Sequence, residues 1–294
     1  MRFGGHETFP IRTGWLSKGL LLSNGRNVQF DDPSVADVLG VGRNMSKSIR
    51  HWLHVTGLVT RDGRNAPIIL TELGRLILSR DPYLQHIATW WALHINLATQ
   101  TTAAAAWRWF FNDFARERFD RLTCIDEFTR ALERKVNRLP SRKTIARDIA
   151  CLLQSYSTPL PAEPLDPEDA TDCPLRMLKL IVQHRDTGYF DRRFIVRPIP
   201  PELLGYAFAQ MQGEDHSGHF EIPFTDALVL QFAPGRVLAL DAEGLASLLN
   251  DAERVCGRDK IRTFLLGGER MIAVVWKSPT SWLADYYERV GACT

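Results

Sequence analysis

The sequence predicts a mainly α protein of the α+β class, with an N-terminal winged helix-turn-helix, a central helical region and a C-terminal mixed α/β region. Three observations support this prediction. Apolar residues recur at helical spacing in residues 39–59, and a hairpin signal follows them. Residues 81–156 show helical patterns, whereas helices and short strands alternate later in the chain. We therefore expect four parts: residues 1–80, residues 81–157, a linker over residues 158–174, and residues 175–294.

The first pattern predicts a helix that is entered through the turn Gly40-Val41-Gly42 and ends near Gly57. Glycine adopts the sharp turns and left-handed conformations that occur at helix ends. Asn44 or Ser46 can cap the first free amides. A short helix over residues 34–39, opened by Asp32-Pro33, precedes this one. One face should pack in a core, because its residues recur every three or four positions: Met45, Ile49, Leu53 and Thr56.

Another face of the same helix is basic. A packing face combined with a basic face is what a DNA recognition helix requires. An ordinary amphipathic helix with solvated charges would show the same pattern. Residues 58–61 and 67–70 are predicted to form strands joined by the turn Asp62-Gly63, and this order of elements favours the DNA-binding interpretation. The predicted DNA contacts are Arg43, Asn44, Lys47, Arg50, His54, Arg61 and Arg64.

The central region contains an aromatic run and a second basic stretch. The run over residues 103–114 could stack nucleic-acid bases, but such runs more often form a core, which is what we expect. Residues 116–147 are rich in arginine, which indicates either solvated helix faces with ion pairs or a second contact to a DNA backbone. The linker over residues 158–174 has five prolines and five acidic residues, typical of a solvated loop.

The C-terminal region alternates between the two kinds of element. Residues 175–182 are expected to be helical and residues 236–240 to form a strand. Asp241 should cap the next helix. Two further strands, residues 261–266 and 271–276, should form a hairpin around Gly267-Gly268.

Composition and missing motifs exclude several classes of protein. The formal net charge of +2 is too small to indicate a partner by itself. No run of about 18 apolar residues predicts a membrane span, and the N-terminus lacks the apolar segment of a signal peptide. The five cysteines are widely spaced, as expected for reduced thiols in a cytoplasmic protein. Motifs of P-loop NTPases, dinucleotide-binding folds, serine hydrolases and zinc peptidases are missing from the sequence.

Several motifs of the chain resemble the SspB-like family of bacterial proteins, over nearly the whole length. The most specific are Phe3-Gly-Gly-His-Glu-Thr-Phe9 and, after Arg12, the run Gly14-Trp-Leu-Ser-Lys-Gly19. Weaker ones are Leu39-Gly-Val-Gly-Arg-Asn-Met45, Ser48-Ile-Arg50 and Asp172-Cys-Pro-Leu175. The resemblance implies a role in a DNA phosphorothioation system that acts against phage, in which one DNA strand is cut and sulfur replaces a non-bridging phosphate oxygen. It also implies partners, namely cysteine desulfurase, ATPase and sulfurtransferase-like subunits.

Cutting a strand requires an activated water molecule and charge stabilisation at phosphorus. The N-terminal residues offer the necessary groups, with His6 as base or ligand, Glu7 as ligand or base, and Arg12 and Lys18 as phosphate contacts. A divalent cation, Mg²⁺ or Mn²⁺, would be held by Glu7, Asp31 and Asp32. The alternative is that His6, Glu7 and Arg12 form a buried latch that fixes the terminus.

The sequence therefore leaves three functions open. The protein is expected to bind double-stranded DNA and to nick one strand. Alternatively, it is a non-catalytic DNA-binding subunit that recruits the sulfur-transfer machinery. A transcriptional regulator ranks last, because the regions beyond the predicted wing are larger than a simple repressor needs.

Overall fold

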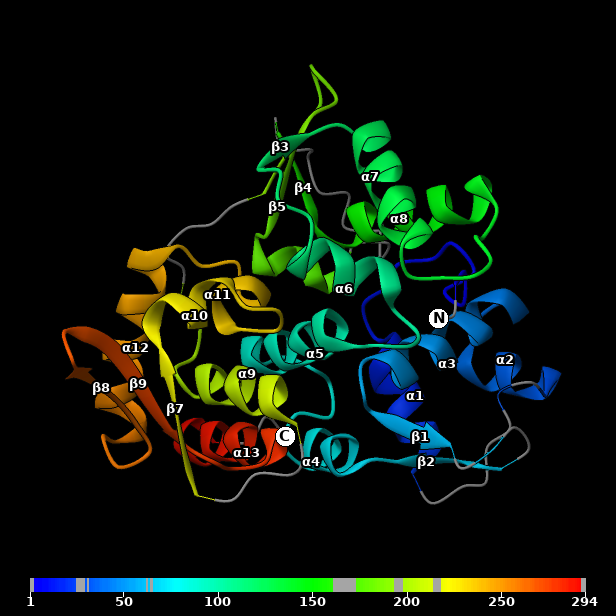
Figure 1. Cartoon of the computed structure of the whole chain (residues 1–294). Coiled ribbons are helices and arrows are strands. Elements are labelled where there is room, and N and C mark those ends of the chain that lie inside the picture. Colours follow the sequence, from blue (N-terminus) through cyan, green and yellow to red (C-terminus); the bar gives the residue numbers. More distant parts are fainter. Residues whose placement is uncertain are drawn as a thin grey trace.

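The structure, a computed structural model, describes residues 3–24, 30, 32–61, 63, 66–160, 173–192, 198–213 and 218–291 (Figure 1). It is a mixed α+β fold in which helices predominate, as predicted. The N-terminal elements are α1 (Trp15–Ser23), α2 (Pro33–Leu39), α3 (Arg43–Val55), β1 (Val59–Arg61), β2 (Ile68–Leu70) and α4 (Glu72–Arg80). The next elements are α5 (Ile87–Thr99), α6 (Ala105–Asn112), β3 (Arg118–Phe119), α7 (Arg121–Glu133), α8 (Arg142–Tyr156) and β4 (Ser157–Leu160).

The remaining elements continue the alternation of helix and strand. They are η1 (Pro174–Leu178), β5 (Ile181–His184), β6 (Phe190–Arg192), α9 (Glu202–Gln212), β7 (His219–Pro223), α10 (Phe224–Val229), α11 (Pro234–Val237), α12 (Ala242–Cys256), β8 (Ile261–Leu266), β9 (Glu269–Val275) and α13 (Pro279–Val290). Among the residues with a described placement, no helix is both long and apolar enough to cross a membrane.

Helices α2 and α3 are separated by the predicted glycine turn. Gly40 ends α2 in the left-handed region (φ +66°), and Gly57 follows α3 with φ +78°, as the sequence predicts. Neither Asn44 nor Ser46 caps α3: its N-cap is Gly42, which makes no side-chain bond, and the Ser46 hydroxyl is buried without a partner. Strands β1 and β2 pair antiparallel, with Thr60 opposite Ile69.

The apolar face of α3 packs into the core. Ile49, Trp52 and Leu53 are fully buried. Helix α1 lies against this face at Gly19, where a Cβ would approach Leu53 Cδ1 to 2.6 Å. Glycine therefore permits the close approach of α1 to α3.

A four-stranded sheet joins the middle of the chain to residues beyond the proline-rich stretch. Its order is β3-β6-β5-β4, with β4 and β5 parallel and the other pairs antiparallel. Ser157 pairs with Ile181 and Phe119 with Phe190. The first residues of the predicted linker over residues 158–174 belong to β4. The rest of the predicted linker lies between β4 and β5, which are neighbours in this sheet.

A second sheet, in the order β7-β9-β8, lies at the C-terminal end of the fold. Its β8–β9 hairpin turns at Gly267 and Gly268, as predicted. Helix α13 then returns to pack on α9, where Gly205 lies against the Trp282 ring. The aromatic run is core, also as predicted, since Trp107, Trp109, Phe110, Phe111 and Phe114 are all buried. One continuous hydrophobic cluster extends from α1 to α13.

Candidate nucleic-acid interface

The outer face of α3 carries most of the predicted DNA contacts. Arg43, Asn44, Lys47 and His54 are exposed, and Arg50 is half-buried. The helix contains no Asp or Glu, so its own sequence offers no carboxylate to neutralise these cations. Since its other face is anchored in the core, α3 presents a fixed row of positive and polar groups to solvent.

The structure describes one of the two arginines predicted to contact DNA from the hairpin. Arg61 is partly buried, and its Nε donates to the carbonyl oxygen of Ala66 at 2.7 Å. This bond joins the two arms of the hairpin, so Arg61 has a structural role there. Arg64 lies outside the described residues.

The N-terminal segment is docked beside α3 by a buried carboxylate. Asp148 Oδ1, on α8, lies 2.9 Å from His6 Nε2 and accepts the Gly4 amide at 3.1 Å. The Thr8 amide donates to His6 Nδ1 at 3.0 Å. The imidazole therefore accepts through Nδ1 and donates through Nε2. With 2% of its surface exposed, His6 has both ring nitrogens engaged inside the protein.

Aromatic rings surround this histidine and account for the Gly-Gly-His motif. The His6 ring stacks on Trp52 of α3 at a centroid distance of 6.2 Å and meets Trp107 of α6 edge-on at 5.9 Å. A Cβ on Gly5 would overlap the ring of His51, so only glycine fits there. Trp52 Nε1 also donates to the Phe9 carbonyl oxygen at 3.0 Å. The motif is therefore an anchoring device that joins the terminus to α3, α6 and α8.

The other N-terminal candidates have different neighbours from His6. Glu7 is exposed, and both it (φ +50°) and Thr8 (φ +72°) lie in the left-handed region. Such conformations in non-glycine residues cost about 1 kcal/mol each and often occur at functional sites. The Arg12 guanidinium lies over the rings of Phe9 and Trp15, at 5.6 and 5.4 Å.

Lys18 and the aspartates before α2 also make local contacts. Lys18 Nζ donates to the Leu39 carbonyl oxygen at 3.2 Å. Asp32 caps α2 by accepting the Ser34 amide at 2.9 Å, and this bond and the Ser34 hydroxyl lower the pKa of the Asp32 carboxyl. Asp31 lies outside the described residues.

The structure describes two of the three predicted cation ligands, Glu7 and Asp32. Within the described ranges, no group of three His, Cys, Asp or Glu side chains gathers in a way that could hold a metal ion. Glu7 is exposed, and Asp32 caps α2.

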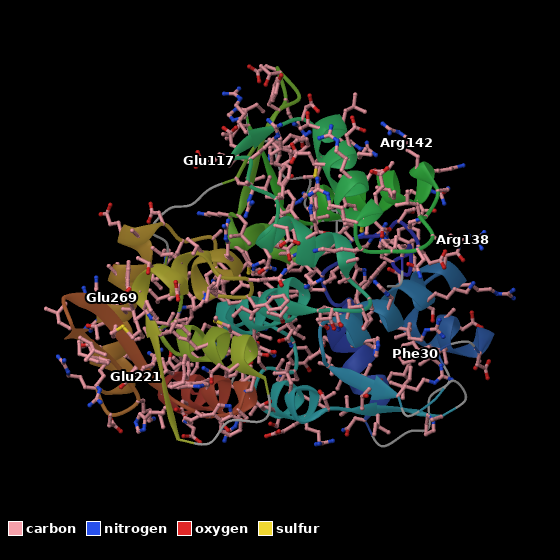
Figure 2. The ribbon with its side chains drawn as sticks, in the orientation of Figure 1. Phe30, Glu117, Arg138, Arg142, Glu221 and Glu269 are labelled. Carbon is pink, nitrogen blue, oxygen red and sulfur yellow. The ribbon has the colours of Figure 1, made fainter. Side chains whose placement is uncertain are left out.

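A second basic surface lies on the end of α7, the following loop and the start of α8. Its exposed members are Arg130, Arg134, Lys135, Arg138, Arg142, Lys143 and Arg147. Lys135 pairs with Asp113 at 3.0 Å and Arg142 with Asp126 at 2.8 Å. Figure 2 shows Arg138 on the same side of the molecule as α2 and α3. Helix α8 also contacts the docked terminus, since a Cβ on Gly4 would lie 3.9 Å from Thr144 Cγ2.

No local sequence pattern marks Asp148, the residue on which the docking of the terminus depends. It lies 142 residues from His6, and its setting in α8 resembles that of any amphipathic helix. Trp52 and Trp107 were visible only as apolar positions. No local pattern connects these residues, because they meet only through the tertiary fold.

Comparisons with known proteins agree with this architecture. Two solved structures share the fold over 98% of this chain and 87% of the other chain, at 23% sequence identity. One is a crystal structure of SspB, with a TM-score of 0.85, and the other is of magnesium-bound SspB, with a TM-score of 0.84. The resemblance to the SspB-like family is thereby confirmed at the level of the fold.

Comparisons of sequence place the chain in a defined family. A search of curated proteins finds no match. A family model does match, and it covers residues 3–287, from the docked terminus to the last helix. The chain belongs to the DUF4007 family, described as proteins of unknown function.

Proposed function

We propose that this protein binds double-stranded DNA within a phosphorothioation system and nicks one strand so that sulfur can be incorporated. The observation that carries the DNA-binding part is the row of exposed basic and polar residues on α3. The SspB-like fold supports the assignment to a phosphorothioation system, and with it partners of the cysteine desulfurase, ATPase and sulfurtransferase-like classes. A protein of this system would recognise DNA before any sulfur chemistry.

In this proposal, α2, α3 and the β1–β2 hairpin act as a winged helix-turn-helix. Helix α3 would enter the major groove, with Arg43, Lys47 and Arg50 near phosphates or base edges. The hairpin would act as the wing beside it. The basic surface of α7 and α8 would extend the contact along the backbone, because the docked terminus holds α8 beside α3.

The nicking step is assigned to the N-terminal segment. A water oxygen would form a bond to phosphorus while a base takes the water proton. The bond from phosphorus to the leaving sugar oxygen would break, and that oxygen would acquire a proton. Glu7 is the better candidate for the base, because it is exposed whereas both nitrogens of His6 are occupied. His6 then acts as a positioning residue, and Arg12 and Lys18 remain candidate phosphate contacts.

The hydrogen bonds at both ring nitrogens of His6 also favour a second function. A histidine held on both nitrogens is typical of a structural latch, and a latch needs no chemistry. The protein would then be a non-catalytic DNA-binding subunit that recruits the sulfur-transfer machinery to its site.

A supercoiled plasmid separates the two functions. The purified protein is incubated with the plasmid and Mg²⁺ or Mn²⁺, and binding is measured in parallel on a short duplex. The nickase predicts open circles, which disappear in Glu7→Gln while duplex affinity and the midpoint of urea unfolding stay unchanged. Binding without open circles in the wild-type protein would refute the nickase and leave the recruiting subunit. No duplex binding at low salt would overturn both.

A further inference from the structure

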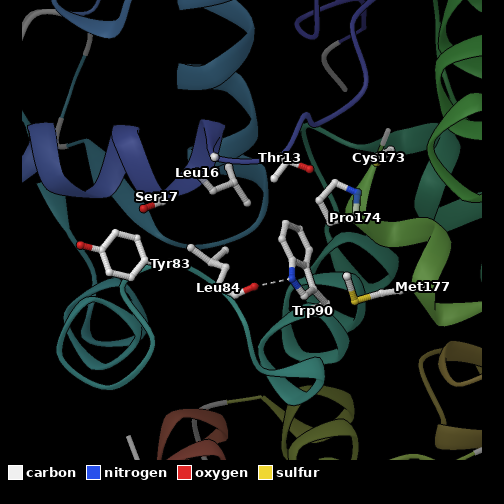
Figure 3. A pocket seen from close by; sticks show the side chains of 10 residues that line it. Thr13, Leu16, Ser17, Tyr83, Leu84, Trp90, Cys173, Pro174 and Met177 are labelled. Carbon is white, nitrogen blue, oxygen red and sulfur yellow. Dashed lines mark hydrogen bonds between the residues drawn. The ribbon is translucent and has the colours of Figure 1, made fainter. Parts of the chain in front are cut away.

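A pocket of about 220 Å³ lies at the start of α1 (Figure 3). Three segments that are distant in sequence form it: residues 13–17, residues 83–90 and residues 173–177. The first and last of these carry residues of the motifs that resemble the SspB-like family. Figure 3 shows the Trp90 indole between Leu84 and the pair Pro174 and Met177.

The wall of the pocket is held in place by buried hydrogen bonds. Leu84 has a left-handed backbone (φ +54°), and its carbonyl oxygen accepts from Trp90 Nε1 at 2.9 Å. The Asp81 carboxylate fixes the same loop by accepting the amides of Gln85 and His86. Because these bonds are all within the protein, they order the wall themselves and a ligand would not have to do so.

The lining selects a neutral, largely apolar ligand. Leu16, Leu84, Trp90 and Met177 supply flat or flexible apolar surface, and no charged side chain belongs to the lining. The polar groups are the hydroxyls of Thr13, Ser17 and Tyr83 and the Cys173 thiol, and Ser17 already donates to the Pro82 carbonyl oxygen. The volume is below the roughly 300–1,000 Å³ of sites for drug-sized molecules. A ligand with a single neutral ring system matches both this volume and this apolar lining.

The pocket segments and the residues beside them in the sequence are rich in cations. Residues 11–18, 80–90 and 173–180 together contain five cations and one acid, Asp81, which is buried and occupied as described. The five cations are Arg12, Lys18, Arg80, Arg176 and Lys179. A neutral aromatic pocket whose flanking residues in the sequence are basic suits a polyanion that carries neutral rings. Single-stranded DNA has this chemistry, and proteins bind it with aromatic side chains and basic grooves.

We propose that this pocket binds one unstacked base of single-stranded DNA, with the neighbouring phosphates contacting the surrounding cations. The inference rests on the proposed function, since a nick frees a strand end whose bases can leave the duplex. Trp90 would supply the wall for the base, and the exposed ring of Tyr83, 60% accessible, would cover its outer face. Bound in this way, the free end would stay on the protein while the duplex is held at α3.

Two variants of the pocket test the proposal. Thr13→Phe fills the mouth at an exposed position, and Tyr83→Ala removes the exposed ring. Thr225→Phe, on an exposed turn of α10, is the matched control. Fluorescence anisotropy measures affinity for three probes: fifteen-nucleotide oligothymidylate, an abasic deoxyribose-phosphate strand of the same length, and a duplex. Urea unfolding checks that each variant folds.

The proposal predicts a defined pattern. Each pocket variant should weaken oligothymidylate binding about tenfold, the effect of losing one base–aromatic contact. Affinity for the abasic strand and the duplex should not change, and Thr225→Phe should behave like the wild type. Equal wild-type affinity for oligothymidylate and the abasic strand would overturn the proposal, as would folded pocket variants with unchanged oligothymidylate affinity.

A fourth probe identifies the other possible occupant. An acidic peptide with a single leucine has similar charge but no base. If Thr13→Phe abolishes peptide binding and leaves oligothymidylate binding intact, the pocket is a protein-docking site and the base proposal fails. Failure of the proposed function looks different, because wild-type duplex binding would then be missing whatever the pocket binds.

Discussion

The two halves of the chain both contain many cations, but they differ in net charge. Residues 1–160 carry 22 Lys and Arg against 14 Asp and Glu, a net charge of +8, whereas residues 161–294 carry 14 against 20, a net charge of −6. Figure 2 shows Arg138 and Arg142 on one side of the molecule and Glu221 and Glu269 on the opposite side. The overall charge of +2 hides this asymmetry.

Helix α3 also differs from the C-terminal half in the acidic residues that accompany its cations. In the C-terminal half, Lys260 and Lys277 share Asp285, Arg289 binds Glu202, and Arg254 binds Asp251. Helix α3 has five basic or imidazole side chains and no acid. Cations gathered on one surface raise the local positive potential, and this potential attracts a polyanion. The lack of acidic residues within α3, more than the number of cations, therefore distinguishes the surface proposed for DNA.

The largest expected effect is a loss of stability when a buried carboxylate loses its partner. Each half has such a carboxylate, Asp148 in the N-terminal half and Glu202 in the C-terminal half. Removing the partner of Asp148 with His6→Ala should lower the free energy of unfolding by about 3–4 kcal/mol, since water cannot easily replace a side chain that is 2% exposed. Arg289→Ala should cost less, about 1–3 kcal/mol, because the Arg289 side chain is 43% exposed and its removal would open the buried Glu202 carboxylate to water. Urea unfolding measures both. Equal losses would show that His6 is no more of an anchor than Arg289.

Charge reversal should separate the halves by function. Lys47→Glu with Arg50→Glu is expected to weaken duplex binding about 100-fold at low salt and to reduce the salt dependence, because fewer counterions are released. The control, Arg254→Glu with Arg258→Glu, alters exposed cations of the C-terminal half and should change affinity less than twofold. Similar losses in both double variants would refute the recognition role of α3.

Two glycines allow a test of whether packing in each half is linked to binding. A Cβ on Gly5 would overlap His51, and a Cβ on Gly205 would overlap Trp282. Each substitution with alanine should cost about 1–3 kcal/mol of stability through overpacking. We expect only Gly5→Ala to weaken duplex binding, since it shifts the terminus against α3. Anisotropy on folded protein checks this, and an equal effect of Gly205→Ala on binding would contradict it.

The smallest effect concerns acid stability in the C-terminal half. Desolvation raises the pKa of Asp285, but hydrogen bonds from Lys277 and Lys260 outweigh it, so the pKa is lowered. The resulting stability is present above the unfolded pKa of about 3.9 and is lost as the pH falls through the lower folded pKa. Since the group is partly solvated, we expect less than about 1 kcal/mol. Asp285→Asn should remove this part of the acid-induced loss in urea unfolding between pH 5 and pH 2, and an unchanged pH profile would exclude it.

Elements with local signals were predictable from the sequence. The α2–α3 turn follows from Gly40, the end of α3 from Gly57, and the start of α12 from Asp241, whose side chain accepts the Gly244 amide at 2.7 Å. The β8–β9 hairpin follows from two glycines between apolar runs. Each of these signals acts within a few residues, so tertiary context does not override it.

Two predicted elements were wrong, one in a largely apolar run and one where a turn was overlooked. Residues 236–240 were expected to form a strand, but helix α11 ends at Val237 and a buried turn follows it. Periodicity cannot separate helix from strand in a short buried run. Residues 175–182 were expected to be helical. Instead, the short helix η1 ends at Leu178, Lys179 follows with φ +53°, and β5 begins at Ile181.

The candidate site was only half predictable. The sequence singled out the residues of the terminus and the basic face of α3, because unusual side chains cluster there. It could not show that His6 is buried, since that depends on Asp148, or that residues 13–17 meet residues 173–177 at one pocket. Such contacts between distant parts of the chain are decided by the packing of whole helices.

The single oxygen that binds both Gly4 and His6 also sets the order in which the protein can mature. His6 is synthesised before its partner, because Asp148 is added 142 residues later. At synthesis rates of about 5–20 residues per second, His6 waits roughly 7–30 s for its partner. The segment with the most specific motif of the chain is thus made before α8 and fixed only after α8 has been made. A nascent chain that stops before α8 would carry the motif without the means to hold it.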